Sequence, residues 1–268
     1  MTRPLTDAER VRYSRQIRVP GFGETVQVRL LAARALIVGV GGLGSPAAMY
    51  LAACGVGTLV LSDFDRVEPS NLQRQIIHRE GSIGEPKALS ALHTLRDLNP
   101  ACTVLPLDHA LADEELRAEI GHADVVLDCS DNFETRFQLN RLCVETRTPL
   151  VSGSAIRADG QILSVLPDAP DSPCLRCLHG DDLSAVETCA AEGILAPVVG
   201  VIGVLQAQQA LLILAGAVPG ATYARAVDGR PVPGATASTA PEVLGENSGS
   251  FRLGSAINPF SFDSSPAA

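Results

Sequence analysis

The sequence has almost no lysine. Of its 21 basic residues only Lys87 is a lysine, and the 268 residues include no tryptophan and two methionines. Arginine carries the same charge, so a preference for arginine in the genome explains the general bias. The single exception is a candidate for chemistry that needs a compact, mobile ammonium group rather than a planar guanidinium. Chance is the alternative explanation for one residue.

Cysteine and histidine are both absent from the last part of the chain. The seven cysteines are an odd number, and neither cysteine nor histidine follows Cys189. The N-terminus has no basic segment followed by a long apolar run, so we expect no signal peptide. This pattern favours reduced thiols in the cytoplasm over a disulfide framework. Cys54, Cys129 and Cys143 lie in apolar stretches, and we expect them to be unreactive core residues.

The chain has fewer basic residues (21) than acidic residues (30). The formal net charge of −9 argues against a general nucleic-acid or anionic-membrane surface. Hydrophobic residues make up 46% and charged residues 19% of the chain, which is typical of a globular protein. The most apolar segment, 196–218, contains Gln206, Gln208 and Gln209 in its middle. A buried or half-buried helix is therefore the favoured interpretation, and a membrane span is the alternative.

A glycine-rich turn organises the first half of the chain. Residues 35–40 are apolar and rich in β-branched side chains, which predicts a buried strand. The pattern G-x-G-x-x-G follows at 39–44, then a predicted helix at 45–54, a strand at 58–62 and Asp63. Such a unit binds nucleotides, because glycine lets backbone N–H groups approach phosphate at a helix N-terminus and the acid can hold ribose hydroxyls.

The alternation continues along the chain. Further strands are predicted at 103–107, 124–128 and 149–152, and further helices at 86–98, 113–120 and 133–145. This order predicts an α/β fold with a Rossmann-like, doubly wound, mostly parallel sheet. After residue 152 we expect an antiparallel extension, with a turn at Asp159-Gly160 and a strand at 161–166. A long apolar helix is predicted at 197–214.

The N-terminal segment is rich in arginine. We expect a helix at 6–18, because Thr6 can cap it and Glu9 follows three residues later as in a capping box. Its arginines either form a solvated face or contact phosphate across a dimer interface. One domain is expected at 1–227, with the nucleotide-binding core at 34–152 and a region that contains the C-x-x-C pair and the segment around Cys189 at 153–216. A flexible Gly/Ser/Pro-rich tail is expected at 228–268.

Polar residues gather where the predicted strands end. Asp63 and Asp131 each follow a parallel strand, so both are expected to face the crevice at the carboxyl edge of the sheet. Lys87 lies in the first turn of a helix, where a cation opposes the helix dipole, which favours a role in facing an anion. Phe133 and Phe137 follow helical spacing, and we expect them to be core residues.

Five elements occur together in one order. They are G-x-G-G-L-G at 39–44, D-F-D at 63–65, S-N-L-Q-R-Q at 70–75, G-x-x-K at 84–87 and D-x-x-D-N at 128–132. With R-Y-S-R-Q at 12–16, they resemble the ThiF/MoeB/HesA family, the bacterial relatives of ubiquitin-activating enzymes. The resemblance covers about residues 9–216, and its S-N-L-Q-R-Q element is far more specific than the glycines.

The resemblance implies an activity and roles for individual residues. Members of that family use Mg-ATP to adenylate the C-terminal glycine carboxylate of a small ubiquitin-like sulfur carrier. It implies that Arg74 and Lys87 bind phosphates, that Arg15 reaches the site from a partner subunit of a homodimer, that Asp131 binds Mg²⁺ and that Asp63 holds the ribose. The implied cofactor-binding residues are Gly39, Gly41, Gly42, Gly44, Asp63, Asp65, Ser70, Asn71, Gln75 and Asn132. Surface salt bridges for the two arginines and an N-cap role for Asp131 are the alternatives.

The cysteines of this chain match the pattern of the family less completely than the other motifs do. In one branch of the family a cysteine in a segment like that around Cys189 joins the carrier's C-terminus after adenylation, and in other relatives that cysteine is dispensable; both interpretations stay open. The family commonly holds zinc with two C-x-x-C pairs. Cys174 and Cys177 supply one pair and His179 a possible third ligand, but the sequence offers no second pair. Either zinc is absent, which we favour, or it is weakly bound or shared.

Two other enzymes are compatible with parts of the sequence. An NAD-dependent Rossmann oxidoreductase would account for the glycines and Asp63, but not for 70–75, Arg15 or Lys87. An ATP-dependent dehydratase of a modified tRNA base belongs to the same superfamily, and the acidic charge argues against it. We therefore expect a cytoplasmic adenylyltransferase with a Gly-Gly sulfur carrier and a possible sulfur donor, a cysteine desulfurase or rhodanese, as partners.

Overall fold

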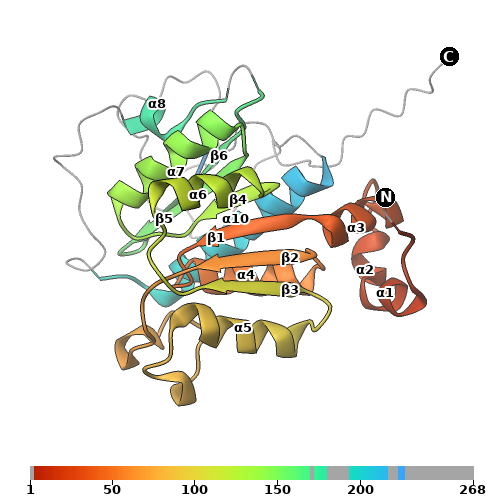
Figure 1. Cartoon of the computed structure of the whole chain (residues 1–268), viewed down its shortest axis with the longest axis horizontal. Coiled ribbons are helices and arrows are strands. Elements are labelled where there is room, and N and C mark those ends of the chain that lie inside the picture. The colour runs from red at the N-terminus through yellow and green to blue at the C-terminus, as the bar shows by residue number, and fades with distance from the viewer. Residues whose placement is uncertain (1–2, 170–171, 180–192, 217–222, 227–268) are drawn as a thin grey trace, which may run out of the picture.

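The protein is described by a computed structural model for residues 3–169, 172–179, 193–216 and 223–226. Its centre is one seven-stranded sheet in the order β3-β2-β1-β4-β5-β6-β7 (Figure 1). The strands are β1 (Arg34–Val38), β2 (Thr58–Ser62), β3 (Thr103–Leu107), β4 (Val125–Asp128), β5 (Leu150–Ile156), β6 (Asp159–Val165) and β7 (Tyr223–Ala226). The first five run parallel, and β6 and β7 add antiparallel strands. The predicted doubly wound sheet with an antiparallel extension is thereby confirmed.

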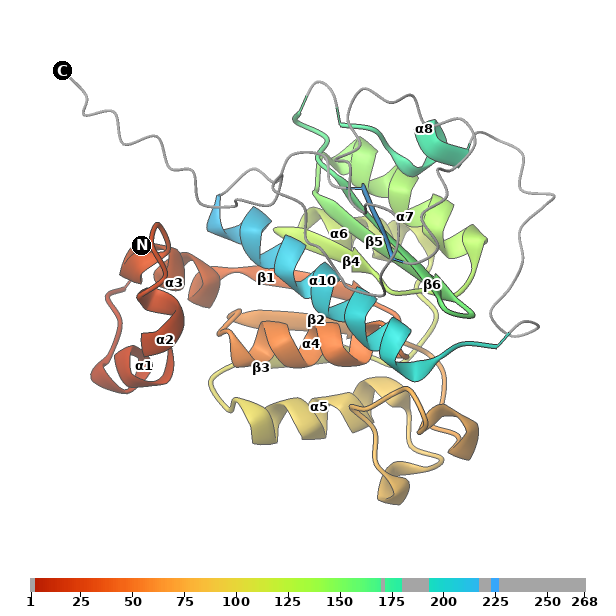
Figure 2. The ribbon, with the colours of Figure 1, turned by 180° about the vertical axis from the view of Figure 1, so that it is seen from behind.

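Two apolar layers cover the sheet. Each strand buries alternate side chains on opposite faces, as the period of two requires. Ile37 and Leu61 belong to the core shared with α4 (Gly44–Ala53), α5 (Lys87–Leu98) and α10 (Ala196–Ala215). Leu36 and Val60 belong to the core shared with α6 (Asp113–Gly121), α7 (Phe133–Thr146) and the short α8 (Leu175–His179). The view from behind shows α4 and α10 side by side on the first face (Figure 2).

Helix α10 is a core helix of this fold. Within the described residues it is the one helix long and apolar enough to cross a membrane. It lies across the sheet, and the fully buried Gln206 donates through Nε2 to the backbone carbonyls of Asp128 (2.7 Å) and Val151 (3.1 Å). The predicted buried or half-buried helix is confirmed, since its polar residue satisfies main-chain groups of the sheet.

The N-terminal helices lie at the amino ends of the strands. Thr6 and Glu9 form the predicted capping box at the start of α1 (Asp7–Arg12). The predicted helix 6–18 breaks at Tyr13, after which α2 (Ser14–Ile17) follows, and α3 (Gly23–Ala32) leads into β1. The break has a tertiary cause: Tyr13 is 2% exposed, and its hydroxyl accepts a hydrogen bond from Asn99 at the end of α5 (3.0 Å).

The hairpin between β5 and β6 differs from the prediction. Asp159 pairs with Ile156 and Gly160 with Ala155, so both predicted turn residues belong to β6. The turn is made instead by Arg157 and Ala158, with Arg157 in the left-handed region at φ 55°. Arg157 also exchanges two backbone hydrogen bonds with the segment before α10: its N–H donates to Gly193 O, and its carbonyl accepts from Leu195 N–H (both 2.9 Å). This tertiary pairing fixes the turn two residues earlier than Asp-Gly propensity predicts.

Candidate nucleotide-binding site

Three neighbouring strands end at the same level. Val38 of β1 is in register with Ser62 of β2 on one side and with Asp128 of β4 on the other. The residues that follow therefore leave the sheet side by side. The strand order reverses between β1 and β4, and ligands of doubly wound sheets bind at such a switch point. A cavity of about 650 Å³ lies there.

The glycine turn after β1 needs two of its glycines for steric reasons. Gly39 has φ 90°, and a Cβ on it would lie 2.7 Å from the carbonyl oxygen of Cys129. Gly44 begins α4, and a Cβ there would lie 2.0 Å from the carbonyl oxygen of Gly39. Gly39, Gly41 and Gly42 line the cavity, whereas Gly44 does not. The role of Gly44 is close packing within the turn.

The turn presents unpaired backbone amides to the cavity. The carbonyl of Gly41 accepts from both the N–H (2.9 Å) and the hydroxyl (2.6 Å) of Ser45. Among the described residues, the N–H groups of Gly41, Gly42 and Leu43 have no acceptor in the protein, and all three residues line the cavity. Free amides at the start of a helix favour anions through both hydrogen bonding and the helix dipole. The turn therefore fits the phosphates of a nucleotide.

Asp63 lies on one side of this turn. Its Oδ2 accepts from the N–H of Val40 (2.7 Å) and its Oδ1 from the N–H of Asp65 (3.0 Å). Burial raises the pKa of Asp63, while Lys87 and the two N–H groups oppose this shift. Each carboxylate oxygen keeps a further acceptor site, so Asp63 can still bind hydroxyl groups.

Lys87 and Asp65 form an ion pair at the edge of the cavity. Lys87 is the first residue of α5 and is 6% exposed, and its Nζ lies 2.8 Å from Oδ2 of Asp65. Both residues line the cavity. A buried ammonium at a helix N-terminus loses hydration and opposes the dipole, and one exposed carboxylate is a modest compensation. The position is therefore suited to an additional anion.

The S-N-L-Q-R-Q segment supplies two cavity residues. Arg74 and Gln75 line the cavity, and Oε1 of Gln75 is buried without a hydrogen-bond partner among the described residues. Arg74 donates to the carbonyl of Ser70 (3.2 Å) and forms no salt bridge with any other described residue. Ser70 and Asn71 do not line the cavity. Asn71 is buried and shapes the turn, since its Oδ1 accepts from the N–H of Glu68 (3.1 Å).

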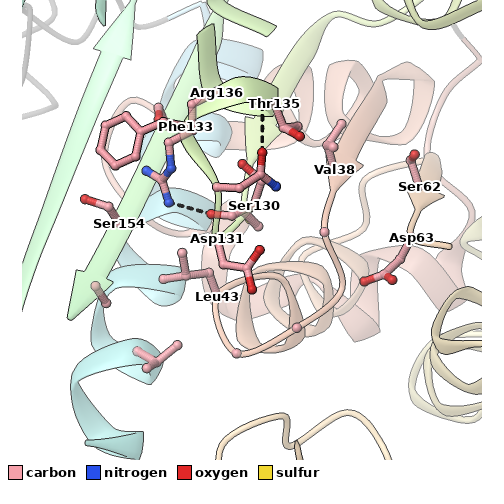
Figure 3. A pocket seen from close by; sticks show the side chains of 18 of the residues that line it. Val38, Leu43, Ser62, Asp63, Ser130, Asp131, Phe133, Thr135, Arg136 and Ser154 are labelled. Atoms are coloured by element: carbon pink, nitrogen blue, oxygen red, sulfur yellow. Dashed lines mark hydrogen bonds between the residues drawn. The ribbon is translucent and has the colours of Figure 1, made fainter. Parts of the chain in front are cut away.

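Asp131 lies on the other side of the glycine turn (Figure 3). It is exposed, lines the cavity, and has no hydrogen bond or ion pair with the described residues. The N-cap of α7 is Asn132, whose Oδ1 accepts from the N–H of Thr135 (2.9 Å), so the alternative role for Asp131 does not apply. The segment before it is anchored, because the buried Asp128 accepts from the hydroxyls of Ser130 and Ser152 (both 2.6 Å).

The sequence interpretation missed several cavity residues. Arg136 is 6% exposed, donates to the carbonyl of Ser130 (2.5 Å) and lies over the ring of Phe133 at 5.7 Å (Figure 3). Phe133 was expected in the core, but it is half-buried and lines the cavity. The spacing of Phe133 and Phe137 predicts a helix with an apolar side, but it does not indicate that the first turn of this helix borders the cavity. The cation–π geometry and the hydrogen bond hold the loop that carries Asp131.

Arg15 lies far from the cavity of its own chain. It is an exposed residue of α2, and α2 packs at the amino ends of the strands, opposite the edge where the glycine turn lies (Figure 1). The neighbouring Gln16 donates to the carbonyl of Cys54, at the far end of α4 (2.7 Å). Arg15 forms no salt bridge within the described residues.

The cysteines fall into three groups. Cys102, Cys129 and Cys143 are buried and Cys54 is half-buried; burial raises the pKa of all four thiols, as is typical of unreactive core residues. Cys174 and Cys177 have their Sγ atoms 3.4 Å apart, outside the residues that line the cavity. Cys189 lies outside the described residues.

The C-x-x-C pair does not form a complete zinc site in the described chain. A structural zinc takes four ligands, and these two thiols supply half of them. Across the described residues no group of three or more histidine, cysteine or acidic side chains could hold a metal ion. Metal analysis of the purified protein measures its zinc content directly.

His78 is a further buried group beside the cavity. It is 4% exposed, and burial lowers its pKa to about 4, with the charges of Lys87 and Arg79 acting in the same direction. Between pH 6.5 and 4 the unfolded chain therefore binds a proton that the folded chain does not, so stability falls as the pH falls through this window. The full loss is about 3 kcal/mol.

We expect His78→Gln to reduce this acid sensitivity. Glutamine does not titrate, so the free energy of unfolding should fall by about 3 kcal/mol less than in the wild type between pH 6.5 and 4. Urea unfolding at several pH values measures the difference. His122→Gln is the matched control, because His122 is exposed at the end of α6 and forms no ion pair among the described residues, so this variant should keep the acid sensitivity of the wild type. Parallel profiles for the wild type and His78→Gln would contradict a buried neutral His78.

Comparison with known families decides how this site is interpreted. Residues 13–231 match the family model described as the ThiF family. The chain belongs to the ThiF family. A dehydrogenase is therefore not the favoured interpretation of the glycine turn. The matched region contains the glycine turn, Lys87, Asp131 and both cysteines of the C-x-x-C pair.

Curated relatives are similar to this chain in sequence, and a solved structure is similar to it in fold. The molybdopterin-synthase adenylyltransferase of Escherichia coli (strain K12) is 48% identical over 79% of this chain and 85% of the relative. The sulfur carrier protein ThiS adenylyltransferase of the same organism is 42% identical over 84% of this chain and 90% of the relative. The crystal structure of E. coli MccB shares the fold, with a TM-score of 0.67 and 22% identity over 79% of this chain and 64% of that chain.

Proposed function

We propose that this ThiF-family protein adenylates the C-terminal glycine carboxylate of a ubiquitin-like sulfur carrier with ATP and releases pyrophosphate. The proposal rests chiefly on one observation: free amides of the glycine turn, Lys87, Arg74 and Asp131 line a single cavity at the switch point. Two relatives that are more than 40% identical are named adenylyltransferases of this kind. ATP–pyrophosphate exchange with a carrier that ends in Gly-Gly tests the proposal.

The reaction needs cations and positioning rather than a general base. The carrier's carboxylate is ionised at neutral pH and attacks the α-phosphorus of ATP, so that a new C–O–P linkage forms. The bond from that phosphorus to the bridging oxygen breaks, and pyrophosphate leaves with the electron pair. Because both reactants are anionic, the amides of the turn, Lys87 and Arg74 lower the barrier by offsetting charge as they hold the phosphates.

Asp131 is the residue of this chain that suits Mg²⁺. Magnesium is commonly bound by one or two carboxylates together with phosphate oxygens and water. Asp131 has an exposed carboxylate in the cavity that is unpaired among the described residues, whereas Asp65 is paired with Lys87. When bound, the ion would neutralise phosphate charge. Asp63 would hold the ribose, on the opposite side of the glycine turn.

Arg15 is proposed to act in the site of a partner subunit in a homodimer. Its distance from the cavity of its own chain supports this, because α2 packs at the opposite end of the sheet (Figure 1). Arginine suits such a contact, since its guanidinium can bind phosphate oxygens in pairs.

Mixing two inactive chains tests this arrangement. Arg15→Ala and Lys87→Ala proteins should each be inactive alone, but a mixed dimer would contain one site with both residues intact. After subunit exchange, we expect about a quarter of the wild-type activity, because half of the dimers are mixed and one of their two sites is complete. Continued inactivity of the mixture, with mixed dimers demonstrated by two affinity tags, would place Arg15 in its own subunit's site or outside any site.

The remaining partners follow from the same proposal. The acyl-adenylate would next be attacked by sulfur that a donor such as a cysteine desulfurase or rhodanese supplies as a persulfide, in the cytoplasm, and AMP would leave. Cys189 is either dispensable or attacks the acyl carbon and releases AMP: its thiol then gives a thioester, and its persulfide, once charged by the donor, gives an acyl-persulfide. Cys189→Ser should leave ATP–pyrophosphate exchange intact in both cases, because adenylation precedes any thiol step. The named relatives act on different carriers, so the small Gly-Gly protein that co-purifies with this chain identifies the pathway.

A further inference from the structure

Both main-chain polar groups of Val40 are held by side chains, so the peptides on each side of it are fixed. The N–H of Val40 donates to Oδ2 of Asp63 (2.7 Å), and its carbonyl oxygen lies 3.0 Å from Nε2 of His78. A carbonyl can only accept, so Nε2 of His78 carries the proton. Nδ1 of the neutral ring then accepts from the hydroxyl of Ser90 (2.9 Å), a residue of α5.

This contact determines where the next amide points. A trans peptide is planar, and its C=O and N–H groups point in opposite directions. The structure contains no cis peptide bond among the described residues. The Val40 carbonyl points toward His78, which does not line the cavity. The N–H of Gly41 therefore points away from His78, and Gly41 lines the cavity.

We propose that His78 is a positioning residue for the nucleotide: it holds the Val40 carbonyl away from the cavity and thereby presents the Gly41 amide to a phosphate oxygen of ATP. The proposal rests on the proposed function of the cavity as an ATP site. His78 itself does not line the cavity, so it acts through the peptide alone. The charged groups that face its ring, Lys87 and Arg79, are both cations and favour the neutral ring.

Removal of the His78 side chain should allow the Val40–Gly41 peptide to rotate. In His78→Ala the Val40 carbonyl loses its partner, and the peptide can rotate so that the carbonyl faces the incoming phosphates. We expect the Kd for ATP, measured by calorimetry without any carrier, to rise about tenfold or more. His78→Gln carries an amide donor of similar reach and should stay within about threefold of the wild type. His93→Gln, on the exposed side of α5, is the control for loss of a histidine.

Isotope labelling reports on the amide directly. The sequence contains four Val–Gly pairs, which end at Gly39, Gly41, Gly57 and Gly200, so ¹³C-carbonyl valine with ¹⁵N-glycine gives four amide signals. ATP should shift the Gly41 signal strongly in the wild type and in His78→Gln, and only weakly in His78→Ala. Gly57, whose N–H donates to the carbonyl of Leu30 (2.8 Å), should not respond in any of them.

The outcomes separate this inference from the proposed function. A His78→Ala protein that melts earlier but binds ATP with unchanged affinity and an unchanged Gly41 shift would overturn the positioning role and leave the proposed function standing. A wild-type protein that binds no ATP would overturn both. Where His78→Ala does not fold, His78→Asn takes its place, because asparagine is too short to reach the Val40 carbonyl and should weaken ATP binding equally.

Discussion

Lys87→Met is expected to lower the rate of ATP–pyrophosphate exchange by at least about 100-fold, the usual cost of removing one preorganised charge-stabilising group. The ammonium is 6% exposed at the first position of α5, beside the phosphate-binding turn, with Asp65 as its partner. Methionine preserves the apolar stem, so packing is retained. Initial rates of exchange at saturating ATP and carrier measure the effect.

The stability of this variant separates a role in chemistry from one in folding. A cation in the first turn opposes the helix dipole, and the Asp65 side chain left behind is 56% exposed. We therefore expect the melting temperature of Lys87→Met to equal or exceed that of the wild type. Arg66→Met is the matched control, because Arg66 bonds the carbonyl of Gly84 in the same loop outside the cavity and should keep exchange within about twofold of the wild type. Exchange at the wild-type rate in Lys87→Met would contradict its assignment to phosphate.

Gly44→Ala is expected to destabilise the protein by about 3 kcal/mol and to abolish ATP binding. An added Cβ would lie 2.0 Å from the carbonyl oxygen of Gly39, a main-chain atom that cannot move without displacing the turn. Gly39 is itself fixed, because its N–H donates to the carbonyl of Ser62 (2.8 Å) and the backbone of Cys129 packs directly against its Cα. Urea unfolding and ATP calorimetry measure the two effects.

Other glycines provide controls for this prediction. Gly81→Ala has open space around the new Cβ and no positive φ, so it should change stability by less than about 0.5 kcal/mol. Gly41→Ala is intermediate, with its nearest contact 3.4 Å away at the flexible amide of Gln75, and should keep the fold while it weakens ATP binding. A Gly44→Ala protein as stable as Gly81→Ala would show that the turn has another conformation.

Local signals in the sequence predicted most of the scaffold. The predicted strands at 58–62 and 103–107 are β2 and β3 residue for residue, because β-branched runs bounded by turn residues determine strands locally. The glycine turn and the acids Asp63 and Asp131 were located because the carboxyl ends of parallel strands meet at one edge. Lys87 stood out for its rarity, and the structure places it in the cavity.

The features that sequence alone missed depend on contacts between distant residues. The break at Tyr13 requires Asn99, which is 86 positions away, and the role of His78 requires Val40, 38 positions away. The hairpin turn at Arg157 follows from pairing with the segment at 193–195 rather than from the local Asp-Gly sequence. Phe133 has the spacing of a core residue, and the position of the cavity above the start of α7 determines its exposure.

The most direct test of the account is carrier-dependent exchange of radiolabelled pyrophosphate into ATP. The purified protein is incubated with ATP, Mg²⁺ and each small carrier of its own organism that ends in Gly-Gly, alongside the same carriers lacking those two residues. The account predicts rapid exchange with at least one intact carrier and none with its truncated form, because the shortened tail ends two residues earlier and its carboxylate cannot reach the α-phosphorus. Exchange with none of the intact carriers, by a protein that is folded and binds ATP, would contradict it.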